Sequence, residues 1–261
     1  MPDSILAGVY DAAAKHLGIA DVGHRSAVAN VQAGDALSLF AAVHDAVCRN
    51  YVTSNATANK DRSSQNWRWH SPQPQISAHN TSAEVILERA VAAAAVALAR
   101  TDWSNQVPVA SGLVSRTGDR RRAIDLVRRM GEKHFQLIEL KISSDTPLYA
   151  AVELLGYASL LLIARADPPS RATAILDADT IGLRVLAPAA FYSGYELREL
   201  GRALDAGVRA LGLAHDVTMS FAFAVLDEAL CADALPSGSE LLNLFDCHLG
   251  LHDTQPRRQS G

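Results

Sequence analysis

Hydrophobic positions recur at helical spacing in the first part of the chain. Residues 4–18 and 35–52 carry Ala, Leu and Val every three or four residues, which predicts two helices. Residues 53–82 then contain few apolar side chains, which predicts a polar linker or a long surface loop. We therefore expect a small N-terminal helical element, residues 1–52, ahead of the main domain.

After residue 82 the pattern alternates between helix and strand spacing. Thr81 or Ser82 can cap the first of these helices. Helices are predicted over 83–100, 145–165, 195–213 and 240–249, and strands over 112–115, 123–128, 135–142, 172–177, 183–187 and 217–226. This order is typical of one α/β layer domain, residues 83–251, followed by a flexible tail, residues 252–261.

Composition limits the kinds of partner that the protein can bind. The chain has 261 residues, of which 49% are hydrophobic, and can bury one sizeable core. Its net charge of −4 leaves no global positive excess, so any contact with nucleic acid must be local. The three scattered cysteines, and the lack of a secretory pattern or a long enough apolar run, favour a cytoplasmic protein with no membrane partner.

The segment 123–142 has the pattern of a β-hairpin and contains candidate catalytic residues. If it is symmetric about Glu132, Asp125 lies opposite Glu139. Strand alternation then directs Asp125, Glu139 and Lys141 to one face, toward a common solvent-accessible hollow. The other face is expected to pack against the helix that begins near residue 83, and it comprises Ile124, Leu126, Ile138, Leu140 and Ile142.

Two carboxylates placed opposite each other on neighbouring strands need a counter-charge. Their Cβ atoms are roughly 4.5–5.5 Å apart, so the groups either repel or share a cation. Mg²⁺ or Mn²⁺ suits such a pair because these hard cations take one or two carboxylates, waters and phosphate oxygens. Lys141 beside them can orient or deprotonate a water. These are the parts of a centre that cleaves phosphodiesters.

This arrangement resembles the PD-(D/E)XK, or restriction-endonuclease-like, nucleases. The matching residues are Asp125, thirteen intervening residues and then Glu139-Leu140-Lys141. A helix with Glu84 and Glu88 precedes them, and a helix with Glu153 and Tyr157 follows. The resemblance implies a restriction-endonuclease-like core, in which helices flank a central mixed sheet, and a metal-dependent nuclease activity.

The resemblance also implies roles for individual residues. Asp125, Glu139 and the carbonyl of Leu140 would hold the metal, with Glu84 or Glu88 completing its shell, and Lys141 would assist the attacking water. The chain departs from the family in two places: Ile124 replaces the motif's proline, and Glu153 stands where one branch has glutamine. A carboxylate at 153 is poorly suited to holding phosphate.

Substrate contacts are expected on either side of the hairpin. Residues 116–133 contain seven basic and three acidic residues, a local excess that could hold a phosphate backbone without reading its sequence. The candidate substrate-binding residues are Tyr157, Glu153, Arg120, Arg121, Arg122 and Arg128. The expected partner is nucleic acid, DNA in preference to RNA, and a homodimer is compatible with cleavage of two strands.

Each of these interpretations has an alternative. Glu139 and Lys141 could form an ordinary ion pair, with Asp125 neutralised by an arginine. Glu84 fits a capping box as well as a metal shell. The Trp67-Arg68-Trp69 triplet could stack on bases, although docking on the core is favoured. The whole protein could be an inactive nuclease-fold scaffold that binds nucleic acid or protein.

Overall fold

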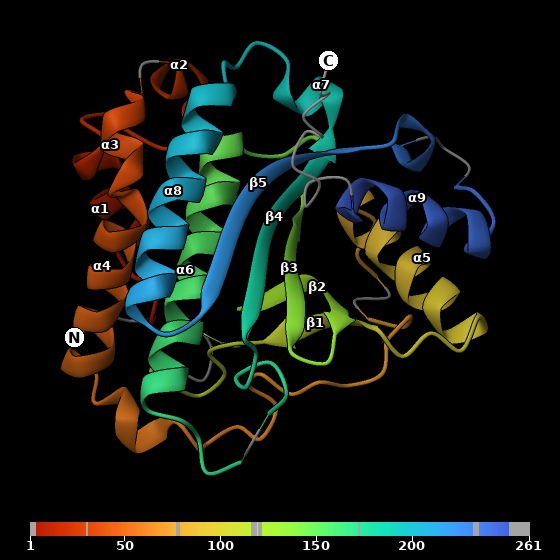
Figure 1. Ribbon diagram of the computed structural model, residues 1–261, viewed down its shortest axis with the longest axis horizontal. Helices are drawn as coiled ribbons and strands as arrows, with labels where there is room; N and C mark the ends of the chain where they lie inside the picture. Colours follow the sequence, from red (N-terminus) through yellow and green to blue (C-terminus); the bar gives the residue numbers. More distant parts are fainter. Residues whose placement is uncertain are drawn as a thin grey trace, which may run out of the picture.

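The computed structural model describes residues 4–29, 31–76, 79–115, 119, 122–171, 173–231 and 235–250, except the side chains of 27 and 248–250. The predicted tail, residues 252–261, lies outside this part. A mixed five-stranded sheet forms the centre of the molecule (Figure 1). In spatial order its strands are β1 (Trp103–Pro108), β2 (Ala123–Gly131), β3 (His134–Leu140), β4 (Thr180–Pro188) and β5 (Thr218–Leu226). The β1–β2 and β2–β3 pairs are antiparallel, whereas β3–β4 and β4–β5 are parallel.

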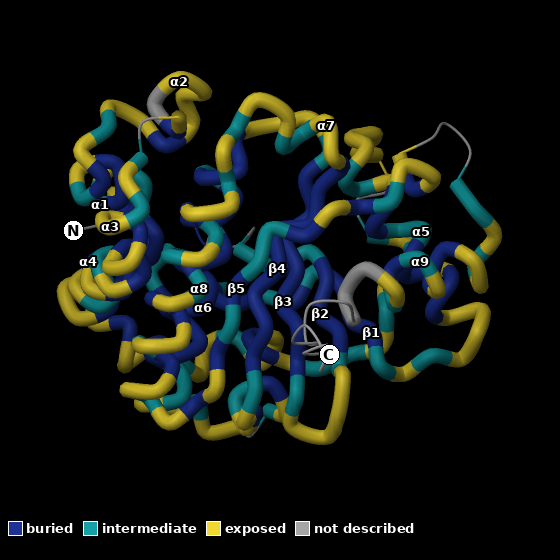
Figure 2. Tube along the Cα trace, turned by 45° about the horizontal axis from the view of Figure 1, so that its top comes forward, coloured by how far each residue is buried: buried dark blue, intermediate teal, exposed yellow. Residues whose placement is uncertain are grey.

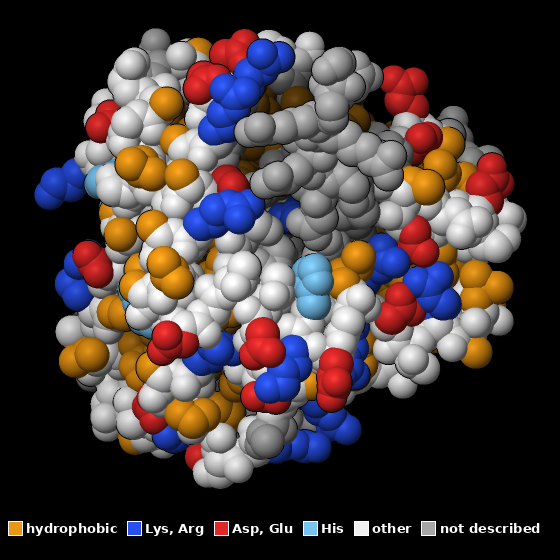
Figure 3. All heavy atoms as spheres, viewed as in Figure 1, with side chains coloured by type: hydrophobic (Ala, Val, Ile, Leu, Met, Phe, Trp, Pro, Cys, Tyr) orange, Lys and Arg blue, Asp and Glu red, His pale blue; other side chains and the backbone are white. Residues whose placement is uncertain are grey.

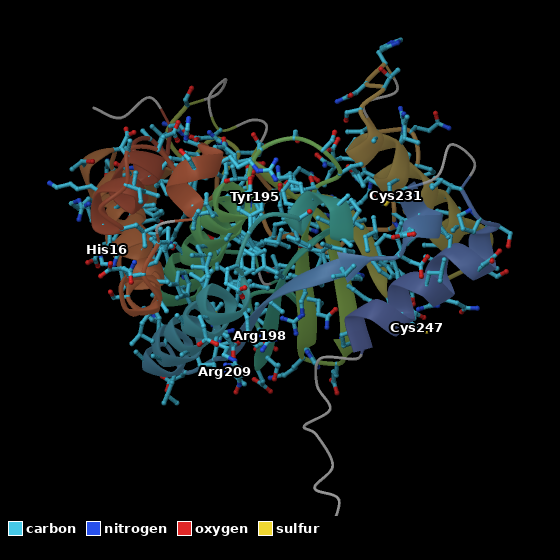
Figure 4. The ribbon with its side chains drawn as sticks, turned by 90° about the horizontal axis from the view of Figure 1, so that it is seen from above. His16, Tyr195, Arg198, Arg209, Cys231 and Cys247 are labelled. Carbon is cyan, nitrogen blue, oxygen red and sulfur yellow. The ribbon has the colours of Figure 1, made fainter. Side chains whose placement is uncertain are left out.

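Helices cover both faces of the sheet, which confirms the predicted α/β class. One face carries α6 (Pro147–Ala166) and α8 (Arg198–Ala214), and the other carries α5 (Ala83–Ala97) and α9 (Gly238–Gly250) (Figure 1). The N-terminal helices pack outside α6 and α8; they are α1 (Val9–His16), α2 (Arg25–Val28), α3 (Ala33–Leu37) and α4 (Leu39–Thr53). The short elements are η1 (Ala56–Asn59), α7 (Ala189–Tyr192) and η2 (Glu228–Cys231). His16 and Cys247 mark the opposite sides of this layered arrangement in Figure 4.

The central helix α6 begins where the sequence predicts. Thr146 caps it by accepting a hydrogen bond from the backbone N–H of Tyr149, and Pro147 occupies the first turn. Within the described part of the chain it is the one helix long and apolar enough to cross a membrane, but 83% of its apolar window is buried inside the protein. It is apolar on nearly every side because it lies between the sheet and the N-terminal helices.

The hydrophobic core has two parts, one on each face of the sheet. The larger part joins α6 and the sheet to the N-terminal helices, and includes Val9 and Phe40. The smaller part lies under α5 and α9, and includes Leu87 and Phe245. Buried segments therefore run through the middle of the molecule, as Figure 2 shows. The N-terminal element shares its core with the main domain.

The segment 53–82, predicted as a polar linker or a long surface loop, packs closely on the sheet. Trp67 is buried, and its backbone N–H donates a 2.8 Å hydrogen bond to the carbonyl of Pro108 at the end of β1. The ring of Trp69 packs edge-on against Phe135, with 5.5 Å between centroids. Docking on the core, the favoured interpretation of the tryptophan triplet, is confirmed.

Two predicted strands are wrong and one strand was missed. Residues 112–115 form a loop, because the carboxylate of Asp119 accepts the backbone N–H groups of Val114 (3.0 Å) and Ser115 (2.9 Å). The described residues of 172–177 form a turn. The missed strand, β1, contains three consecutive polar residues, 104–106, which hide the alternation expected of a strand.

Candidate active site

The β2–β3 hairpin has the predicted register. Leu126 pairs with Ile138 and Arg129 with Phe135, as symmetry about Glu132 requires. Beyond Leu126 the two strands separate: the backbone N–H of Leu140 donates to Asp125 Oδ2 at 2.9 Å, and that of Lys141 donates to the β4 residue Leu186. The Asp125 side chain therefore lies where the hairpin opens.

Lys141 connects the acidic residues of the site. Its Nζ lies 3.0 Å from Glu139 Oε1, 3.4 Å from Glu153 Oε2 and 3.5 Å from Asp145 Oδ2. Glu139 is 4% exposed and Lys141 9%, while Asp125 is half-buried. The three predicted residues come together, but the expectation of an open hollow is wrong for Glu139 and Lys141, because the carboxylates and core residues around them exclude solvent.

Burial and mutual repulsion favour the protonated form of both strand acids. Burial raises the pKa of Asp125 to about 6, against the opposing effects of the Leu140 N–H and the Lys141 ammonium. Burial, followed by the charge of Asp125, raises the pKa of Glu139 well above its usual range. Burial alone would lower the pKa of Lys141, but the neighbouring carboxylates Glu139 and Glu153 raise it, so the ammonium stays charged.

Strand β1 adds two amides that the sequence did not predict as site residues. Gln106 has a left-handed backbone (φ 48°), which is strained for a residue with a side chain. Its Nε2 donates to Glu88 Oε2 (2.9 Å) and Asp125 Oδ1 (3.4 Å), and Asn105 Nδ2 donates to Glu88 Oε1 (2.8 Å). Glu88 is thus linked to Asp125 through Gln106. Burial and the charge of Asp125 raise the pKa of Glu88 to about 7.

Glu84 fixes the chain segment that follows β3. Its Oε1 accepts hydrogen bonds from the backbone N–H of Ile142 (3.0 Å) and the hydroxyl of Ser144 (3.3 Å). The N-cap is Ser82, one of the two predicted caps, and the alternative of a capping box, which needs Thr81 as the cap for Glu84, is not formed. Burial opposes ionisation of Glu84, but hydrogen bonds from backbone N–H groups outweigh it and lower the pKa.

The apolar face of the hairpin is largely as predicted. Leu126, Ile138 and Leu140 pack in the smaller core under α5. Ile124 instead packs in the larger core, on the other face of the sheet. In the β1–β2 ladder it pairs with Val107, the residue after Gln106.

Tyr157 and Arg128, predicted to bind substrate, have structural partners. The buried Tyr157 hydroxyl donates to Glu153 Oε1 at 3.0 Å and so holds that carboxylate. Arg128 Nη2 lies 2.7 Å from Asp246 on α9, and its guanidinium lies over the ring of Trp103. Both residues are buried and have these partners, although Arg128 Nε and Nη1 have no hydrogen-bond partner among the described residues.

Of the other predicted substrate-binding arginines, only Arg122 lies in the described part of the chain. Arg122 Nη1 is 3.9 Å from Glu153 Oε1, at the edge of the carboxylate cluster. Arg120 and Arg121 lie outside the described residues. On the face of the molecule in Figure 3, basic and acidic side chains are interspersed rather than gathered into one basic patch.

No family model, curated protein or solved structure matches this chain. In the described part, no three His, Cys, Asp or Glu side chains form a group that could hold a metal ion by themselves. Asp125, Glu139 and the Leu140 carbonyl offer oxygen donors, the kind that Mg²⁺ commonly takes together with water and substrate oxygens. Burial and neighbouring acidic charge raise the pKa of both acids, and a positive charge beside them would oppose that rise.

Proposed function

We propose that this protein is a metal-dependent nuclease with a restriction-endonuclease-like core, which hydrolyses phosphodiester bonds of DNA or RNA. The observation that carries the proposal is the meeting of Asp125, Glu139 and Lys141 at the point where β2 and β3 separate. One buried and one half-buried carboxylate beside an ammonium suit the binding of a cation and a phosphate better than they suit packing, because like charges removed from water are unfavourable.

Each site residue would have a distinct role in hydrolysis. Asp125, Glu139 and the Leu140 carbonyl would hold Mg²⁺ or Mn²⁺, which when bound would polarise the phosphate and acidify a water. The Lys141 ammonium, held by Glu139 and Glu153, would orient the attacking water and stabilise charge that develops on the phosphate. Glu88 would act through Gln106 as a positioning residue for Asp125.

The direct test is cleavage of DNA and RNA by the purified protein with Mg²⁺ or Mn²⁺. We expect cleavage that EDTA abolishes. Asp125→Asn and Lys141→Gln should each lower it by about 10²–10⁴-fold, the usual contribution of such groups. Lys15→Gln, which removes an exposed lysine from α1, is the control and should keep parental activity. Full cleavage by both site variants would reject the site.

The burial of Glu139 and Lys141 favours a second candidate, an inactive nuclease-fold protein that binds nucleic acid or protein as a scaffold. In that case the Lys141–Glu139 pair neutralises a buried charge and has no catalytic role. A parent protein that binds nucleic acid without cleaving it, and whose thermal stability does not respond to divalent cations, would support the scaffold and reject the enzyme.

A further inference from the structure

A tyrosine from the N-terminal helices lies beside the carboxylate cluster. The ring of Tyr10 on α1 stacks on Tyr149 of α6, with centroids 4.3 Å apart and planes 8° apart. Tyr149 precedes Glu153 by one helical turn. Burial first, and the charge of Glu153 second, raise the pKa of the Tyr10 hydroxyl. Helix α1 therefore brings a polar group to the site, although no sequence motif includes it.

Two hydrogen-bond donors in this region lack an acceptor. The Tyr10 hydroxyl and Arg122 Nε are buried, and neither has a partner of normal hydrogen-bond geometry among the residues that the structure describes. Tyr149 raises the pKa of the Tyr10 hydroxyl through a weak side-chain hydrogen-bond interaction and its charge, but the two groups do not meet normal hydrogen-bond geometry. Leaving a buried donor unsatisfied is destabilising. A buried polar group without a protein partner calls for an explanation, and a bound ligand that supplies acceptors is one.

Glu153 separates these donors from the catalytic lysine. One of its oxygens, Oε2, lies 3.4 Å from Lys141 Nζ, and the other, Oε1, lies 3.9 Å from Arg122 Nη1. Two cations and the Tyr157 hydroxyl therefore offset the charge of this carboxylate. A group bound by Arg122 and Tyr10 would lie next to a group bound by Lys141.

We propose that Tyr10 and Arg122 form a subsite for the phosphate that flanks the scissile phosphodiester of the nucleic acid. This inference rests on the proposed function. Both orphan groups are donors, so the ligand must supply acceptor oxygens, and the guanidinium favours an anionic one. Successive phosphates along a nucleic-acid strand supply such oxygens to neighbouring sites. In this arrangement Glu153 lies between the two phosphate sites. Its carboxylate holds Lys141 and Arg122 and does not itself contact a phosphate.

The test compares a substrate that has a flanking phosphate with one that has none. Tyr10→Phe keeps the stacked ring and removes only the hydroxyl. We expect it to raise the KM for a short single-stranded oligonucleotide about tenfold, as loss of roughly 1.4 kcal/mol of binding implies. Bis(p-nitrophenyl) phosphate carries a single phosphodiester and no flanking phosphate. The increase in its KM should therefore be several-fold smaller. Arg122→Gln should likewise raise the KM for the oligonucleotide more than the KM for bis(p-nitrophenyl) phosphate.

Tyr51→Phe is the matched control. Tyr51 donates to Asp167, beyond the far end of α6 and about 20 Å along the helix from Glu153, so neither substrate should be affected. Equal losses on both substrates for Tyr10→Phe would show that Tyr10 only supports the catalytic cluster, and no loss on either would show that it binds nothing. Both results would overturn the subsite.

A binding measurement separates failure of the subsite from failure of the proposed function. If the parent hydrolyses neither substrate, the proposed nuclease function fails. The subsite is then decided by fluorescence anisotropy with the labelled oligonucleotide in Ca²⁺. About tenfold weaker binding by Tyr10→Phe than by the parent and Tyr51→Phe would support it. Equal affinities, or no binding by the parent, would overturn it.

Discussion

At the scale of single residues, Glu88 shows how burial couples this site to pH. Its carboxyl group is 2% exposed, and its pKa is raised from 4.5 to about 7 by burial and by Asp125. The folded protein therefore holds this proton more tightly than the unfolded chain. That stabilisation is fully present below pH 4.5 and is lost as the pH rises through 7. The loss is on the order of 3 kcal/mol.

We predict that Glu88→Gln removes this component of the pH dependence. Urea unfolding of parent and variant at pH 5 and pH 8 measures it: the free energy of unfolding of the parent should fall relative to that of Glu88→Gln between the two values. Glu84→Gln, on the same helix, is the control. The pKa of Glu84 is lowered, so its ionisation is complete below this window and the slope should not change. A parent that gains stability over Glu88→Gln with rising pH would contradict the assignment.

The sequence predicted the residues that a single hairpin brings together, but not those that come from distant elements. Asp125, Glu139 and Lys141 follow from strand alternation and a symmetric turn. Gln106 and Tyr10 lie on β1 and α1, and nothing in their local sequence indicates that they approach the hairpin. Their positions depend on tertiary packing, which local patterns do not encode.

At the scale of elements, close packing of α8 against α3 depends on a glycine. A Cβ atom at Gly207 would lie 2.0 Å from the backbone carbonyl oxygen of Leu37, so one helix must move to accommodate it. We predict that Gly207→Ala lowers the free energy of unfolding by about 1–3 kcal/mol, the usual cost of overpacking, although alanine favours helix. Urea denaturation at neutral pH measures this change.

Gly201 on the same helix is the matched control. A Cβ atom there would make an ordinary 3.5 Å contact with the ring of Phe223. Because alanine has the higher helix propensity, Gly201→Ala should be neutral or stabilise by up to about 1 kcal/mol. Equal effects of the two substitutions would mean that α3 and α8 do not pack as closely as the structure shows.

Elements with a regular pattern were predicted well, and those stabilised by side chains were not. Helix α6 and strands β2 and β3 have strong periodicity and clear start signals. Strand β1 has buried polar residues that form hydrogen bonds with other side chains, so its pattern resembles a loop. Residues 53–82 are mostly polar, yet Trp67 and Trp69 pack on the core, and Asn66 forms hydrogen bonds with Ser111.

At the scale of the whole molecule, the N-terminal helices are part of the fold that forms the site. The sequence predicted them as a separate small element, because the polar segment that follows resembles a linker. The structure places Val9 and Phe40 in the same core as Leu155 of α6. Helix α1 also supplies Tyr10, which stacks on Tyr149 of α6 and lies near Glu153. The N-terminal element therefore both stabilises α6 and contributes a side chain to the site.

We therefore predict that a chain of residues 53–261 does not fold cooperatively. Burying a large apolar side chain contributes roughly 1.5–3 kcal/mol, and removing the several that the element supplies exceeds the roughly 5–15 kcal/mol by which such domains are stable. Near-ultraviolet circular dichroism and urea unfolding of the truncated chain test this. Phe40→Ala in the full chain is a milder variant. The full chain should still unfold in a single transition, and its free energy of unfolding should fall by about 3–5 kcal/mol. Two separate transitions, with only one of them shifted, would show instead that the N-terminal helices unfold independently of the sheet and its site.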